Sequence, residues 1–170
     1  TRTLERLVAR YPKDEYWQNL MRSLFRTGGT DKTMLNVYRL ATEVNAMRRG
    51  DDYTEMAQLA IEQGMPGEAQ AALETAFEKK FFTDTRDVDR NQRLLATAKQ
   101  QSTTDRGTLA RQEKDAAAAK TGEAELRVGQ AYISYGQIPQ GLAAVQRGIA
   151  KGGLKNPAEA QLVLGIAHMR

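Results

Sequence analysis

Apolar and small residues recur every three or four positions along much of the chain, which is the spacing of one face of an α-helix. Gly64 and Pro66 interrupt this pattern. Glycine tolerates the left-handed conformation at a helix end, and proline fits the first turn of a helix. The segment around them is therefore predicted to be two helices joined by a short turn. Its two apolar stripes contain Tyr53, Met56, Ala57, Ala60, Ala69, Leu73 and Ala76.

The same joint occurs a second time, 72 residues further on. Gly64 corresponds to Gly136, and the small residue five positions later is Ala69 in the first copy and Gly141 in the second. Similar helix starts fall at positions 14, 50, 122 and 158, so the spacing of 72 is two periods of 36 and the missing start is at 86. A period of this length is typical of helical repeat proteins.

We therefore expect one all-α domain, built as a solenoid of antiparallel helix pairs. The expected repeats are 14–49, 50–85, 86–121, 122–157 and 158–170, with 1–13 as the closing helix of a preceding repeat. The last repeat is truncated, because its second helix does not follow. We expect the chain to be a fragment of a longer array, whose last helix is covered by another molecule or self-associates through its truncated end.

The middle repeat, 86–121, keeps the period but lacks the residues that mark the joint between two helices in the other repeats. Two interpretations of this segment are open. In one, the chain breaks at Ser102-Thr103-Thr104, and Ser102 with Asp105 resembles a capping box that starts a second helix. The period favours this hairpin. In the other, residues seven positions apart share one face of a single long helix. Those residues are Val88, Leu95, Ser102, Leu109 and Ala116.

Small residues recur at the position of the repeat where two helices are expected to touch. These residues are Ala57, Gly129 and Gly165. Two helices can approach closely only where their side chains are small. We predict that Gly129 lies in such a contact.

Composition narrows the classes of function. Of the 170 residues, 41% are hydrophobic and only 6% aromatic, which together with abundant Ala, Leu, Gln and Glu favours helices. The chain has no cysteine and one histidine, His168, so thiol catalysis and Cys- or His-rich zinc sites are excluded. The net charge is +4, with acidic and basic residues interspersed, so a nucleic-acid role is not expected. We predict a protein without catalytic residues, metal or cofactor.

The repeat 50–83 resembles a tetratricopeptide repeat (TPR), a helix–turn–helix of 34 residues. The resemblance is strong in 50–83 and 122–169, weaker in 14–49, and limited to length in 86–121. The chain also looks like the C-terminal part of larger bacterial TPR proteins, many of which are exported. That resemblance favours the bacterial periplasm or cell envelope over the cytoplasm.

The TPR resemblance implies a right-handed superhelix. It also implies a protein–protein interaction module or scaffold that binds a segment of another protein in the concave groove of this superhelix. It places the groove on the first helix of each pair. The alternative is a structural segment of a larger chain with no ligand of its own. The groove residues implied by the resemblance are Gln18, Arg22, Phe25, Arg26, Thr54, Gln58, Ile61, Glu62, Leu126, Gln130, Ile133 and Ser134.

Overall fold

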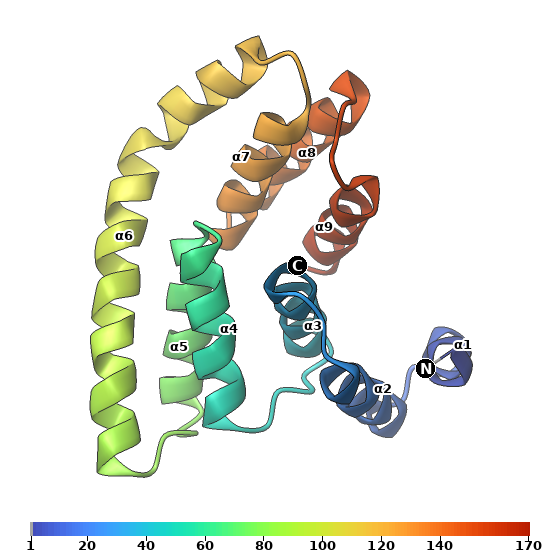
Figure 1. Cartoon of the computed structure of the whole chain (residues 1–170), viewed down its shortest axis with the longest axis vertical. Helices are drawn as coiled ribbons and strands as arrows, with labels where there is room; N and C mark the ends of the chain where they lie inside the picture. Colours follow the sequence, from blue (N-terminus) through green and yellow to red (C-terminus); the bar gives the residue numbers. More distant parts are fainter. Residues whose placement is uncertain (1) are drawn as a thin grey trace.

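The computed structural model describes residues 2–170, and Thr1 of the predicted closing helix 1–13 lies outside them. The described residues form nine α-helices and no strand, which confirms the all-α prediction (Figure 1). The helices are α1 (Arg2–Arg10), α2 (Asp14–Thr27), α3 (Asp31–Glu43), α4 (Gly50–Glu62), α5 (Pro66–Glu78), α6 (Thr85–Ala118), α7 (Glu123–Ser134), α8 (Ile138–Lys151) and α9 (Pro157–Met169).

The helix starts follow the 36-residue period. Helices α2, α4, α7 and α9 begin within one residue of the predicted starts, and each of the first three is followed by a short turn and a second helix. Gly64 and Gly136 occupy equivalent turns with φ of 72° and 75°, a conformation that glycine adopts without strain. Ala69 and Gly141 are both buried on the second helix of their pair. The predicted equivalence of the two joints is confirmed.

The predicted hairpin in 86–121 is wrong, because this segment belongs to α6, a single helix of 34 residues. Ser102, Thr103 and Thr104 all lie inside α6, and the hydroxyls of Thr103 and Thr104 each donate to the carbonyl four residues earlier. The long-helix interpretation is confirmed, and it predicted the buried face in part. The fully buried residues of α6 are Asn91, Ala98, Ser102, Leu109 and Ala116.

The apolar core is divided along α6. One cluster joins α1–α5 to the first half of α6, up to Ala98. A second cluster holds α7, α8 and α9 together, and a third packs the second half of α6, from Leu109 onward, against α7 and α8. Between these two positions the only fully buried residue of α6 is the polar Ser102.

Helices α7 and α8 cross closely through glycines, as predicted for Gly129. A Cβ atom added to Gly129 would lie 2.9 Å from the carbonyl oxygen of Gly141 and would also collide with the side chain of Val145. At Gly165, one period later, an added Cβ would meet no atom within 4 Å. Among residues 2–170, no other helix therefore packs against α9 at this position.

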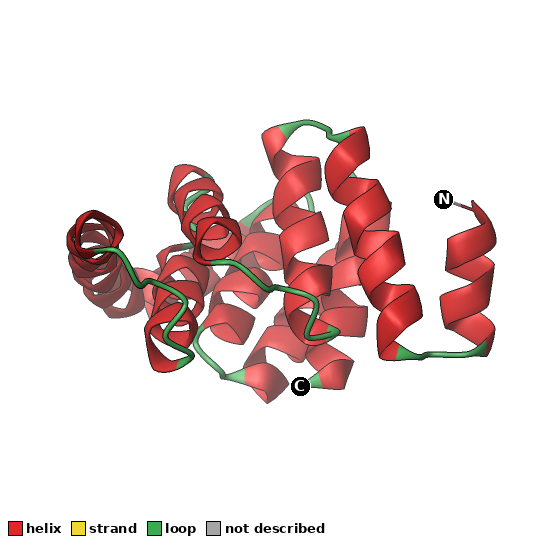
Figure 2. Ribbon diagram, turned by 90° about the horizontal axis from the view of Figure 1, so that it is seen from below, coloured by secondary structure: helices red, strands yellow, loops and turns green. Residues whose placement is uncertain are grey.

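The chain curls so that its last helix returns to its third. Helix α9 contacts α3 as well as α7 and α8 (Figure 1). In a simple repeat array each repeat contacts only its neighbours, so this contact is an addition to that plan. Helix α1 packs on α2 at one edge of the molecule (Figure 2). The handedness of the superhelix stays a prediction.

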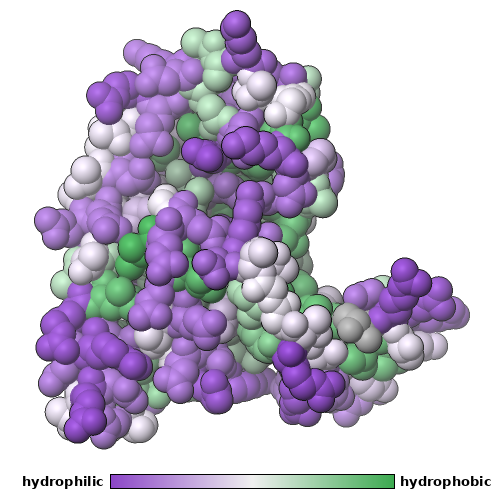
Figure 3. Space-filling view, in the orientation of Figure 1, coloured by the Kyte–Doolittle hydropathy of each residue, from purple (hydrophilic) through white to green (hydrophobic). Residues whose placement is uncertain are grey.

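The face of the molecule seen in Figure 3 is mostly hydrophilic, with hydrophobic residues visible in limited areas between helices. Among residues 2–170, the large hydrophobic side chains that are exposed are Tyr11 and Met169. In this part of the chain, no helix has both the length and the apolar composition that a membrane crossing requires.

Candidate interaction surfaces

The twelve residues implied by the TPR resemblance do not share one groove. Gln18, Arg22 and Phe25 line a groove between α2, α3 and α4, which we call the α2–α4 groove. Leu126 and Gln130 of α7 instead line a cavity at the centre of the molecule. The two sets lie on different parts of the fold, so the implied groove is not continuous.

Several of the other predicted residues have structural contacts. Thr54 is buried and donates its hydroxyl hydrogen to Asn91 Oδ1 of α6 at 2.8 Å. Ile133 is also buried, in the core formed by α7, α8 and α9. For both residues the expectation of a solvent-facing groove position is wrong, because α6 and the C-terminal core cover them.

The remaining predicted residues lie outside both the α2–α4 groove and the central cavity. Ile61 packs, half-buried, against the N-terminal core. Ser134 donates its hydroxyl hydrogen to the Ala131 carbonyl and lines a smaller pocket between α3, α4 and α5. The exposed residues are Arg26, Gln58 and Glu62.

The α2–α4 groove has an apolar floor. Its volume is about 540 Å³. Met21 of α2 and Tyr38 of α3 are buried beneath it, and the ring of Phe25 lies 5.0 Å from that of Tyr38, centroid to centroid. Burial, followed by the hydrogen bond to Glu55, raises the pKa of Tyr38, so the phenol stays neutral at physiological pH. The floor thus offers aromatic and sulfur-containing surface to an apolar side chain.

The walls of the α2–α4 groove carry more positive than negative charge. Arg22 projects from α2, while Arg48 and Arg49 come from the loop between α3 and α4. Arg49 forms an ion pair with Asp52 at 3.3 Å, but Arg22 and Arg48 form no ion pair with any residue of 2–170. Two guanidinium groups therefore remain available to carboxylates of a bound molecule.

The sequence pattern identified only one wall of this groove. Tyr38 and Met34 lie on the second helix of their pair, and the implied groove positions lie only on first helices. Arg48 and Arg49 lie in the loop after α3, outside the positions that the repeat pattern marks. The signal that could have found them is the pair of adjacent arginines directly after the buried Met47.

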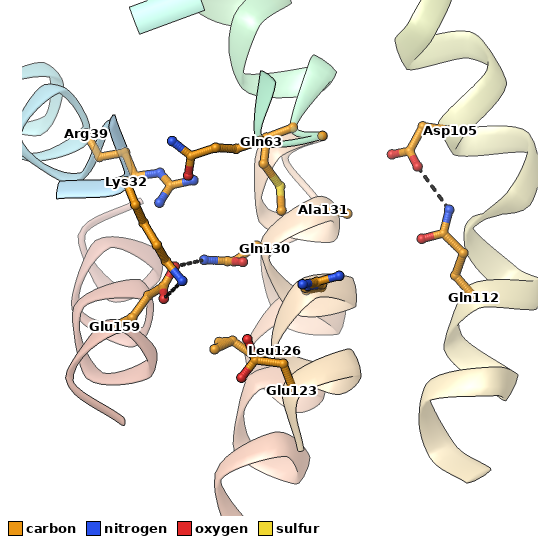
Figure 4. A pocket seen from close by; sticks show the side chains of 13 residues that line it. Lys32, Arg39, Gln63, Asp105, Gln112, Glu123, Leu126, Gln130, Ala131 and Glu159 are labelled. Carbon is orange, nitrogen blue, oxygen red and sulfur yellow. Dashed lines mark hydrogen bonds and ion pairs between the residues drawn. The ribbon is translucent and has the colours of Figure 1, made fainter. Parts of the chain in front are cut away.

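The central cavity is polar, and some of the charged side chains that line it form ion pairs. It has a volume of about 470 Å³ and lies between α3, α6, α7 and α9 (Figure 4). Lys32 Nζ lies 2.6 Å from Glu159 Oε2, and Gln130 donates to Glu159 Oε1 at 3.2 Å. Arg39 donates from Nε to both carboxylate oxygens of Glu68 at 3.0 Å. The ion pair of Lys32 and Glu159 thus links α3 to α9, and the hydrogen bond from Gln130 links α7 to α9.

Within 2–170, no three His, Asp or Glu side chains lie close enough to hold a metal ion together. His168 is exposed on α9 and lines neither the groove nor the central cavity.

Comparison with models of protein families, with curated proteins and with solved structures finds no match to this chain. The resemblance to tetratricopeptide repeats therefore rests on the spacing of residues in the sequence. The functional argument rests on the geometry of the α2–α4 groove.

Proposed function

We propose that this chain is a non-catalytic protein–protein interaction module, built as a TPR-like right-handed solenoid, that binds a short segment of a partner protein in the α2–α4 groove. The observation that carries the proposal is the juxtaposition of an apolar floor with two arginines that form no ion pair with any residue of 2–170. Arg22 lies on one wall and Arg48 on the other, with Phe25 between α2 and α3.

The chemistry of the groove specifies the chemistry of the partner segment. The floor accepts an apolar or aromatic side chain, which would be removed from water against Phe25 and Tyr38. The arginines favour carboxylates on either side of that side chain, since guanidinium groups bind carboxylates in two-point hydrogen bonds. The proposed ligand is therefore a peptide segment in which Leu or Phe is flanked by Asp or Glu.

The proposal is tested with a fluorescently labelled peptide that carries one Phe between Glu residues, next to the same peptide with Lys in place of Glu. Binding of the acidic peptide should weaken as salt increases, because salt screens exposed ion pairs. Replacing Arg22 and Arg48 together by Ala should weaken it about three- to thirtyfold, the range expected for two exposed ion pairs.

Arg26→Ala is the matched control. Arg26 lies one turn from Arg22 on the same helix, but it does not line the groove. Its replacement should leave the affinity unchanged. Equal affinity for the acidic and basic peptides, or no effect of the double substitution, would leave the chain as a structural segment without this ligand.

A further inference from the structure

Helix α9 lies against α3 with an ion pair at each end of the contact. Near the start of both helices, Lys32 Nζ lies 2.6 Å from Glu159 Oε2. Near their ends, Arg170 Nε donates to Glu43 Oε1 at 2.7 Å. Glu43 lies eleven positions after Lys32, and Arg170 lies eleven positions after Glu159. The two helices therefore run parallel and in register. We call these two ion pairs the clasp.

The clasp joins two parts of the fold that have separate apolar cores. We call them the N-terminal body (α1–α5) and the C-terminal body (α7–α9). Helices α1–α5 share one core with the first half of α6, whereas α7, α8 and α9 pack around another and contact the second half of α6. Between the two bodies lies the polar central cavity, with α3 and α9 on one side and α6 on the other (Figure 4). Polar surfaces can separate and hydrate at much lower cost than apolar cores.

The side opposite the clasp has the features of a bend. Helix α6 runs along one side of the molecule past both bodies and changes direction in its upper part (Figure 1). In this helix, Thr103, Thr104 and Thr108 donate their hydroxyl hydrogens to backbone carbonyls three or four residues earlier. Gly107 follows within the same turn, and a Cβ atom there would meet no neighbour within 4 Å. Such hydroxyl bonds and glycines are recognised causes of helix bending.

Contacts near the bend join the end of α7 to α6 and to α5. Tyr135, at the end of α7, donates to Asp105 Oδ2 of α6 at 2.6 Å, and its ring stacks under the guanidinium of Arg106. Gly67 of α5 packs closely against the same tyrosine ring. These short contacts lie next to segment 103–108, so a rotation about that segment would move them little and would move the clasp most.

We propose that the chain is a clamp: α1–α5 and α7–α9 move as two bodies about residues 103–108 of α6, and the clasp holds the clamp closed. Opening separates α9 from α3 and exposes the walls of the central cavity. This inference concerns the motion of the fold and is independent of the peptide proposed for the α2–α4 groove.

Spin labels report this motion directly. The chain has no cysteine, so Glu15→Cys on α2 and Gln146→Cys on α8, both at exposed positions, give one label on each body. Pulsed electron resonance then measures the distribution of distances between them. The parent protein should show mainly one distance, that of the closed clamp.

Replacing Lys32 and Glu43 together by Ala should add a population at longer distance. The first change leaves the buried Glu159 carboxylate without its cation, and opening of the clamp would hydrate that carboxylate. Lys32 is half exposed, so its truncation leaves no cavity in the core. Lys99→Ala is the control. It removes an exposed ion pair between α6 and Glu74 of the N-terminal body, and it should leave the distribution of distances unchanged.

Adding Gly107→Ala to the clasp variant tests the position of the bend. Alanine stiffens a helix relative to glycine, and here it fits without a clash. The longer-distance population should therefore shrink. The proposal is overturned if the clasp variant, folded by circular dichroism, keeps the parent distribution. An unchanged longer-distance population in the Gly107→Ala variant would overturn the assignment of the hinge to 103–108.

Discussion

Gly129 of α7 and Gly141 of α8 face each other across a close contact between the two helices. A Cβ atom on either residue would lie 2.9 Å from the carbonyl oxygen of the other. The contact is thus reciprocal, and neither position has room for a side chain. This explains why the sequence places a glycine at both positions.

Gly129→Leu should destabilise the fold. The added side chain would overlap Val145 and force α7 and α8 apart, which costs about 1–3 kcal/mol or more in the free energy of unfolding. Thermal or urea unfolding measures this cost. The matched control is Gly165→Leu, one period later, where an added Cβ meets nothing within 4 Å. It should leave stability unchanged or raise it slightly, because leucine favours helices more than glycine. Equal unfolding curves for the two variants would refute the role given to Gly129.

Arg39→Ala should be among the most destabilising single changes in the N-terminal body. Arg39 of α3 and Glu68 of α5 are 5% and 10% exposed and form a bidentate ion pair. Removing one partner leaves the other charge buried and unpaired, at a cost of about 3–5 kcal/mol. Urea unfolding should also show that Lys99→Ala, in an ion pair that is half exposed, changes stability by less than about 1 kcal/mol. A small effect of Arg39→Ala would mean that water reaches Glu68.

Alkaline pH should destabilise the fold, in part through Tyr135. Burial, followed by the hydrogen bond to Asp105, raises the pKa of Tyr135 in the folded protein. Above about pH 10 the unfolded chain loses the tyrosine proton while the folded chain keeps it. The folded state then binds more protons, so its stability falls as pH rises. Tyr135→Phe should reduce stability at pH 7, since the bond to Asp105 is lost, and should flatten the decline above pH 10.

The control for Tyr135 is Tyr11→Phe, because the Tyr11 side chain is 52% exposed. Urea unfolding at several pH values between neutral and alkaline gives the slope for each variant. A slope for Tyr135→Phe as steep as that of the parent protein would show that this phenol does not contribute to the alkaline decline.

The period of the sequence predicted helix positions well because local residue types, such as a glycine that ends a helix, mark the joint within a helix pair. Gly64 and Gly136 end helices for the same backbone reason, and both adopt positive φ. In 86–121 these local signals were ambiguous. Ser102 is a good start for a helix, but it is also compatible with a helix interior, and the packing of the Leu109 and Ala116 face on α7 and α8 favours one continuous helix.

The candidate site was less predictable, because its walls come from elements that no local pattern connects. The stripe on α2 identified Arg22 and Phe25, but Tyr38 and Arg48 join them only after α3 and its following loop have packed. The ion pairs of the clasp are even harder to predict from a sequence pattern. Glu43 and Arg170 are 127 residues apart, and the repeat itself contains no rule that brings α9 back to α3.

The central claim is that the α2–α4 groove selects acidic segments with an apolar anchor, and unbiased peptide selection tests it most directly. A random peptide library is selected on the parent protein and on the Arg22→Ala, Arg48→Ala double variant, with thermal unfolding curves to confirm that both are folded. The account predicts that the parent enriches peptides with Leu or Phe flanked by Asp or Glu, that the variant loses this enrichment, and that magnetic resonance shifts caused by a selected peptide fall on α2, α3 and the loop after α3. Enrichment of the same peptides by both proteins, or shifts confined to other helices, would contradict it.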